Sequence, residues 1–174
     1  MDTAAPMSLL SRFLNPPPPP LAPLWAWITA TARQPHWYLD HGVADSIDGR
    51  FDMVALVTAL VMLELEQRDL RAETALLTER FVEDMDGSLR DIGIGDMVIG
   101  KHMGRVVGAL GGRLGAYRAA LAPAAAPGLL PDALARNVYR GDAGSRAEPL
   151  AAAVRALAAR ITATPTDRLL AGEV

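Results

Sequence analysis

The chain has 174 residues, of which 51% are hydrophobic and 5% aromatic, and a formal net charge of −3 at pH 7. This acidic balance gives no general attraction to phosphate groups, so we expect no direct DNA binding. The absence of cysteine excludes disulfides, thiol nucleophiles and iron–sulfur ligation. A core of Ala, Leu, Val, Ile and Met, mostly good helix formers, favours an all-α class.

The N-terminal segment, residues 1–21, is expected to be flexible and disordered because NPPPPP at residues 15–20 forms a polyproline spacer. Both Met1 and Met7 are candidate starts of translation. The first residues lack the charged and apolar regions of a secretory signal. The longest apolar stretch, residues 53–65, is too short to span a bilayer. We therefore expect a cytoplasmic or peripheral protein.

Residues 22–162 are predicted to form one compact bundle of about six or seven helices, followed by a C-terminal tail over residues 163–174. Apolar spacing predicts helices over residues 22–35, 50–69, 71–90, 96–121, 132–139 and 149–161, with a helical turn at 36–41 and a loop at 42–48. The helix over residues 50–69 is apolar on nearly all sides, which indicates a central position.

Four glycines recur at intervals of four residues in the helix over residues 96–121. They are Gly100, Gly104, Gly108 and Gly112. Residues at this spacing share one helix face, so we expect another backbone of the domain to approach that face closely. Basic residues on the same helix argue against a membrane-spanning segment.

One stretch resembles a phosphate-binding loop. From Gly95 to Lys101 the sequence GDMVIGK matches the pattern GxxxxGK, but His102 stands where Ser or Thr should bind magnesium. The pattern also lacks a preceding buried strand. A nucleotide-binding enzyme is therefore the less favoured alternative function.

Metal sites are not predicted either. Asp84, Asp86 and Ser88 resemble the start of a calcium loop whose required Gly and Glu are missing. The acidic cluster Asp45, Asp48 and Asp52 suits a helix N-terminus, and the three histidines are poorly spaced for a shared metal. We expect no catalytic residue, no cofactor and no enzymatic activity.

Four blocks of sequence follow one another between residues 29 and 141. They are RQPHWYL at 33–39, GVADSIDGRFDM at 42–53, FVEDMDGSLRDIGIGDMVIGKHMGR at 81–105 and LARNVYRG at 134–141. Together they resemble the ubiquinol–cytochrome c chaperone family. The resemblance implies a bacterial assembly chaperone for respiratory complex III, the ubiquinol–cytochrome c reductase, that binds newly made cytochrome b stoichiometrically. A generic helical interaction scaffold is the alternative.

The same resemblance implies further partners and a location. The partners are a small partner chaperone and the ribosome, and the location is the cytoplasm or the cytoplasmic face of the inner membrane.

Within the second block, each residue also has a structural interpretation. Asp48 is expected to cap the central helix, Gly49 to turn into it and Phe51 to anchor it in the core. Arg50 and Asp52 are expected as neighbouring paired charges at the surface or in a polar joint.

The third block also has a structural interpretation. Asp86 and Arg90 have the four-residue spacing of a helical ion pair. Gly93 and Gly95 permit a tight turn, and Asp96 caps the next helix.

Two sets of residues are candidates for client contact. The charged set, which either holds the fold or touches the client, is Arg50, Asp52, Arg90, Lys101 and Arg105. The apolar set, which either lines a groove or packs in the core, is Met53, Met62, Met85, Met97 and Met103.

Overall fold

The computed structural model describes residues 19–91 and 96–174, with the side chains of residues 88–91 and 96–103 excepted. Its elements are α2 (Ala22–Ala32), α3 (Pro35–Leu39), α4 (Ile47–Gln67), α5 (Arg71–Asp91), α6 (Asp96–Leu121), α7 (Leu129–Asn137), the 3-10 helix η1 (Gly144–Arg146), α8 (Ala147–Ala163) and α9 (Thr166–Leu170). The predicted all-α class is confirmed. The predicted disorder of residues 1–18 and the choice between Met1 and Met7 lie outside the described residues.

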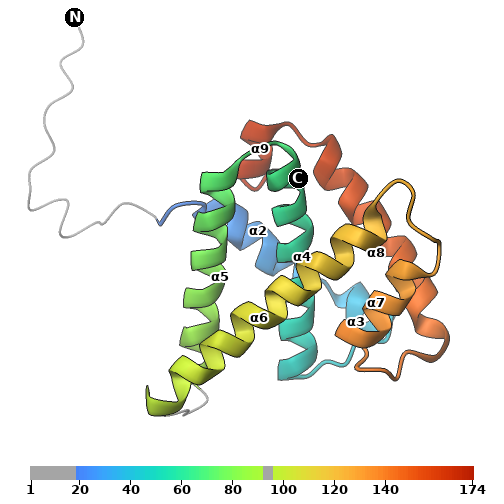
Figure 1. Cartoon of the computed structure of the whole chain (residues 1–174), viewed down its shortest axis with the longest axis horizontal. Helices are drawn as coiled ribbons and strands as arrows, with labels where there is room; N and C mark the ends of the chain where they lie inside the picture. The colour runs from blue at the N-terminus through green and yellow to red at the C-terminus, as the bar shows by residue number, and fades with distance from the viewer. Residues whose placement is uncertain (1–18, 92–95) are drawn as a thin grey trace, which may run out of the picture.

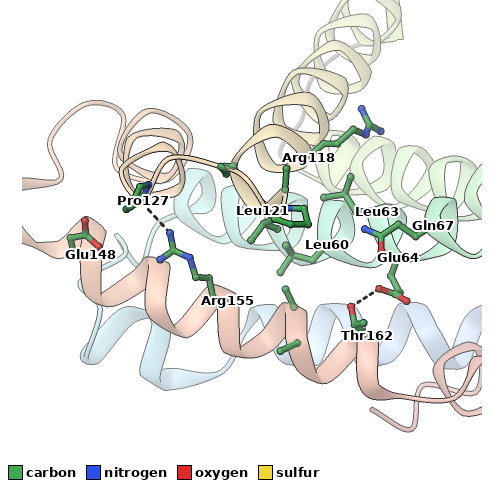
Figure 2. Close-up of a pocket in the computed structure, with 16 residues that line it drawn as sticks. Leu60, Leu63, Glu64, Gln67, Arg118, Leu121, Pro127, Glu148, Arg155 and Thr162 are labelled. Atoms are coloured by element: carbon green, nitrogen blue, oxygen red, sulfur yellow. Dashed lines mark hydrogen bonds between the residues drawn. The ribbon is translucent and has the colours of Figure 1, made fainter.

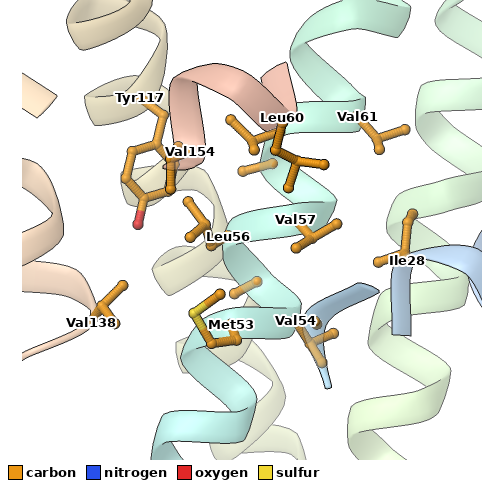
Figure 3. Packing of buried hydrophobic residues seen from close by; sticks show 14 of the residues in the cluster. Ile28, Met53, Val54, Leu56, Val57, Leu60, Val61, Tyr117, Val138 and Val154 are labelled. Carbon is orange, nitrogen blue, oxygen red and sulfur yellow. The ribbon is translucent and has the colours of Figure 1, made fainter. Parts of the chain in front are cut away.

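Helix α4 forms the centre of the bundle, because α2, α5, α6 and α8 all contact it. In Figure 1, α6 crosses in front of α4 while α5 runs beside it. Every residue of α4 from Asp52 to Leu65 is buried. Its side chains reach opposite neighbours: Val57 points toward Ile28 of α2, and Leu56 toward Tyr117 of α6 (Figure 3). Each buried aliphatic side chain contributes about 1.5–3 kcal/mol, so α4 organises the core.

The N-terminus of α4 is capped by Ser46, which corrects the expected cap at Asp48. Ser46 has extended backbone angles, and its hydroxyl oxygen accepts a hydrogen bond from the backbone N–H of Gly49 at 3.1 Å. A short hydroxyl side chain at this position satisfies one of the free N–H groups of the first turn. Asp48 lies two residues further on, inside the first turn, where its charge still favours the helix dipole.

The C-terminal end of α4 is joined to the end of α8 by a buried polar cluster. Arg68 pairs with Glu64 at 2.7 Å and donates hydrogen bonds to the carbonyl oxygens of Ile161, Thr162 and Thr164. These carbonyls lie in the last turn of α8 and at its C-cap residue Thr164, where a helix leaves carbonyl oxygens short of donors. Arg68 therefore caps α8 from a distant helix.

Residues 163–174, predicted as a tail, contain helix α9. Its Leu169 is fully buried, and α9 contacts α2. Gly172 follows with a φ of +71°, and a Cβ there would lie 2.5 Å from the carbonyl oxygen of Pro23. The end of the described chain thus packs closely against the beginning of α2.

The glycines of α6 do not receive a neighbouring backbone, contrary to prediction. Gly104, Gly108 and Gly112 are exposed, and a Cβ built on each would meet nothing within 4 Å. The buried face of α6 is formed instead by Leu110, Tyr117 and Ala120. At 100° per residue these side chains lie opposite the glycines, so the regular spacing marks the solvent face. Whether Gly100 is exposed or buried falls outside the described part of the chain.

Candidate functional site

Two segments that are far apart in sequence form a polar pocket of about 230 Å³. One segment runs from Gly42 to Asp52 and supplies the loop and first turns of α4; the other runs from Val138 to Arg146 and follows α7. The segments are joined by a hydrogen bond of 2.6 Å from the Tyr139 hydroxyl to the carbonyl oxygen of His41. The pocket therefore brings together the sequence blocks at residues 42–53 and 134–141.

Asp52 lies at the base of this polar pocket, with only 1% of its side chain exposed. Its Oδ1 accepts a hydrogen bond of 2.5 Å from Nη2 of Arg113 on α6, and its Oδ2 lies 3.5 Å from Nε of Arg140. Burial raises the pKa of the Asp52 carboxyl, while the two guanidinium groups oppose that rise. The expected pairing of Asp52 with Arg50 is wrong, because successive residues of a helix point in different directions.

Arg50 is exposed and pairs with Asp45 of the preceding loop at 2.7 Å. The hydrogen bond from Arg50 lowers the pKa of the Asp45 carboxyl, which is itself in solvent. The Arg50 side chain lines a separate pocket with Tyr38 and Arg33. Arg50 and Asp52 thus line different pockets of the domain.

The remaining predicted residues of this block have closely defined positions. Asp48 pairs with Arg140 at 2.9 Å. Gly49 lies within α4 rather than in a turn, and a Cβ there would be 2.0 Å from the carbonyl oxygen of Ala44, so only glycine allows this close approach. Phe51 is partly buried against the core, with the Arg113 guanidinium 5.5 Å from its ring centre.

The third sequence block falls partly outside the described residues. Gly93 and Gly95 lie there, as do the side chains of Arg90, Asp96 and Lys101, so the predicted turn, cap and Asp86–Arg90 pair are not placed. Asp96 is the first residue of α6, and the backbone of residues 96–101 is already helical. Arg105 is exposed on α6, and Asp86 is partly exposed on α5.

The methionines divide between core and surface. Met53 and Met62 are buried in α4, and Met85 is partly buried on α5, while the side chains of Met97 and Met103 lie outside the described residues. Met53 and Met62 therefore pack in the core.

An open groove of about 880 Å³ lies between α4, the end of α6 and α8. Figure 2 shows Leu60 and Leu63 of α4 facing Leu121 across it, with α8 forming the opposite wall. On the α8 side the groove is lined by Ala158 and Ala159, whose short side chains leave room in the groove. The rim is charged, with Glu148, Arg118 and Arg155, while Glu64 lines the groove as a buried side chain bound by Thr162. An apolar floor with a charged rim is the usual form of a groove that takes a helix from another protein.

Several residues that form polar contacts in the folded domain were not predicted from the sequence. Arg113, Arg140, Arg68 and Glu64 carry the polar contacts between helices, yet they come from segments far apart along the chain. Glu64 alone had a signal, since it interrupts an apolar stretch.

No cluster of three His, Cys, Asp or Glu side chains in the described part of the chain is arranged to hold a metal ion. No helix among the described residues is long and apolar enough to cross a membrane.

The described residues thus form an all-α domain with two recesses, an open groove and a polar pocket. The sequence profile of the family described as Ubiquinol-cytochrome C chaperone matches residues 39–174, and the chain belongs to this family. Its structure is similar to the crystal structure of the Cbp3 homolog from Brucella abortus, with 30% sequence identity, a TM-score of 0.78 and coverage of 88% of this chain and 86% of that chain. A search of curated protein sequences gave no significant match.

Proposed function

We propose that the chain acts in complex III assembly as a non-catalytic chaperone that binds newly made cytochrome b stoichiometrically. Membership of the ubiquinol–cytochrome c chaperone family carries this proposal. The proposed place of action is the cytoplasm or the cytoplasmic face of the inner membrane, where a membrane subunit would be received. A small partner chaperone and the ribosome are further proposed partners.

The groove between α4, α6 and α8 is the proposed seat of the client. Its floor of leucine and alanine side chains suits an apolar helical segment of a membrane protein, and its charged rim suits the polar ends of such a segment. Binding would remove the accessible surface of Leu121 and Ala159 from water, above Leu60 and Leu63, which are already buried. A chaperone of this kind holds an apolar segment of the client until complex assembly buries it.

Deletion of the gene tests the function as a whole. We expect lower cytochrome b and lower ubiquinol–cytochrome c reductase activity, measured in isolated membranes, and restoration of both by the intact gene. Unchanged cytochrome b and unchanged activity would defeat the proposal.

The Ala159→Glu substitution tests the groove. Ala159 is an exposed residue of α8 that lines the groove, so a glutamate there leaves the core intact but places a carboxylate on the apolar wall. We expect less cytochrome b to co-purify with the tagged variant. Ala156→Glu is the matched control, because Ala156 is exposed on α8 and does not line the groove. Equal recovery with both variants would exclude the groove.

The exposed charges form a second proposed contact with the client. Arg50 and Arg105 are exposed, and Arg90 and Lys101 stay in the proposed set with them. Reversal of each charge to glutamate should reduce co-purification of cytochrome b without changing the free energy of unfolding. If reversal of a residue's charge changes neither the recovery of cytochrome b nor the free energy of unfolding, that residue does not contact the client.

A further inference from the structure

The polar pocket below the start of α4 contains a buried hydrogen-bond acceptor that is not fully used. Oδ2 of Asp52 is inaccessible to solvent and accepts no hydrogen bond. Nε of Arg140 lies 3.5 Å from it, which is longer than a hydrogen bond to a charged donor. Because a buried acceptor without a donor costs about 1–3 kcal/mol, a better placed donor would bind here favourably.

Arg140 is the chain's own cation in this pocket, and it is held only loosely. Its side chain is 59% exposed and pairs with Asp48, which is 67% exposed. The backbone of Arg140 has a φ of +54°, a left-handed conformation unusual for a residue other than glycine or asparagine. The guanidinium therefore crosses the mouth of the pocket without filling its base.

The other charged groups of the pocket are Arg146, Arg113 and Asp142. Arg146 is fixed in the wall, because it donates to the backbone oxygens of Gly42, Asp142 and Ala143 and stacks on the Tyr139 ring. Arg113 reaches Asp52 from α6 and donates to Oδ1. The Asp142 carboxylate is almost wholly exposed at the rim, 3.9 Å from Arg146. With Arg140 in the pocket the acidic and basic groups balance, whereas with Arg140 in solvent the carboxylates of Asp48, Asp52 and Asp142 exceed the two remaining guanidinium groups by one charge, which favours a cation over an anion.

We propose that this polar pocket receives a basic side chain, arginine or lysine, from a partner protein. The incoming cation donates to Oδ2 of Asp52 and to the carboxylate of Asp48, and Arg140 moves outward into solvent. The pocket volume of about 230 Å³ exceeds the roughly 30 Å³ that one water molecule occupies, so there is room for the end of such a side chain. The proposal is independent of cytochrome b and of the apolar groove.

Titration of the full chain with single-residue probes tests this directly. The probes are N-acetyl-argininamide and N-acetyl-lysinamide, with the uncharged N-acetyl-citrullinamide as control, at constant ionic strength. We expect saturable changes in the NMR amide signals of Gly42, Gly49 and Tyr139, which line the pocket, with the two cations only. Absence of saturation with both cations, or equal changes with citrullinamide, would overturn the proposal.

Substitutions at the mouth sharpen the test without disturbing the core. Asp48→Asn should weaken binding of the arginine probe about tenfold, because one charge-assisted hydrogen bond is lost. Asp132→Asn is the matched control, an exposed acid on α7 outside the pocket, and should leave binding unchanged. Equal affinities of the two variants would contradict a role for Asp48.

The Arg140→Gly variant tests the exchange itself. Glycine accepts the positive φ, so the backbone is preserved. Removal of a competitor that occupies a site about nine-tenths of the time tightens binding about tenfold, and we expect a change of this order for the arginine probe. A purely structural role for Arg140 predicts the opposite, and weaker binding by this variant would refute the exchange.

Discussion

The ion pair between Asp52 and Arg113 joins the start of α4 to α6 in the interior. Arg113 is 13% exposed and also donates to the carbonyl oxygen of Asn137, the last residue of α7. Three helices therefore meet at one guanidinium. Burial makes this arrangement sensitive to loss of either partner, because the remaining charge stays in the interior.

Arg113→Met should lower the free energy of unfolding by about 3 kcal/mol, since it leaves the buried Asp52 carboxylate with only the largely exposed Arg140, 3.5 Å away, as its counter-charge. Arg118→Met on the same helix is the control. Its partner is Glu66, and both side chains are substantially exposed, so the loss should stay below about 1 kcal/mol. Urea unfolding followed by circular dichroism measures both losses of stability. Similar losses would show that the buried Asp52–Arg113 pair contributes no more to stability than the exposed Arg118–Glu66 pair.

Gly49→Ala should lower the free energy of unfolding by about 1–3 kcal/mol. The added methyl group would lie 2.0 Å from the carbonyl oxygen of Ala44, so the loop before α4 must shift. Thermal unfolding is the measurement. A variant as stable as the parent would mean that this loop can shift without lowering the free energy of unfolding.

The contrast between Ser46, Asp48 and Asp52 shows what residue patterns predict at this scale. An acidic group near the helix start was predictable, and Asp48 does lie in the first turn. The capping role of Ser46 depends on the extended backbone of one residue. The burial of Asp52 depends on Arg113, which lies 61 residues away. Contacts at such separation carry no local signal.

At the scale of whole helices, periodicity was a good guide to position and a poor guide to neighbours. The apolar circumference of the helix over residues 50–69 predicted a central helix, and α4 is central. The four-residue glycine spacing of α6 predicted close packing, yet the described glycines face solvent. Spacing shows which residues share a face, whereas only the other helices decide whether that face is covered.

Replacement of exposed α6 glycines by alanine should therefore stabilise the domain. Glycine in a helix interior costs about 0.5–1 kcal/mol relative to alanine, and a Cβ at Gly108 or Gly112 meets no atom within 4 Å. We expect the double variant Gly108→Ala and Gly112→Ala to gain about 1–2 kcal/mol in urea unfolding. A loss of stability would mean that these positions require glycine for the helix itself.

At the scale of the whole molecule, the two ends of the described chain meet. Helix α9 packs on α2, and Leu169 is fully buried. The last predicted helix ended at residue 161, and residues 163–174 were predicted as a tail. One buried leucine in a helix of five residues is too weak a pattern to recognise.

Leu169→Ala should lower the free energy of unfolding by about 2–4 kcal/mol, as expected for a cavity in a packed core. Leu39→Ala is the control, because Leu39 is 80% exposed at the end of α3, and it should change stability by less than about 0.5 kcal/mol. Guanidinium unfolding distinguishes the two. Equal effects would show that α9 contributes nothing to the folded core.

The contact of Glu64 with Thr162 joins residues 98 positions apart. During synthesis, the residues that form α4 leave the ribosome long before the residues that form α8. Until then the side of α4 that α8 covers has no partner from its own chain. The newborn protein therefore passes through a stage in which one side of its central helix is open to other molecules, and any product that stops before α8 would remain in that aggregation-prone condition.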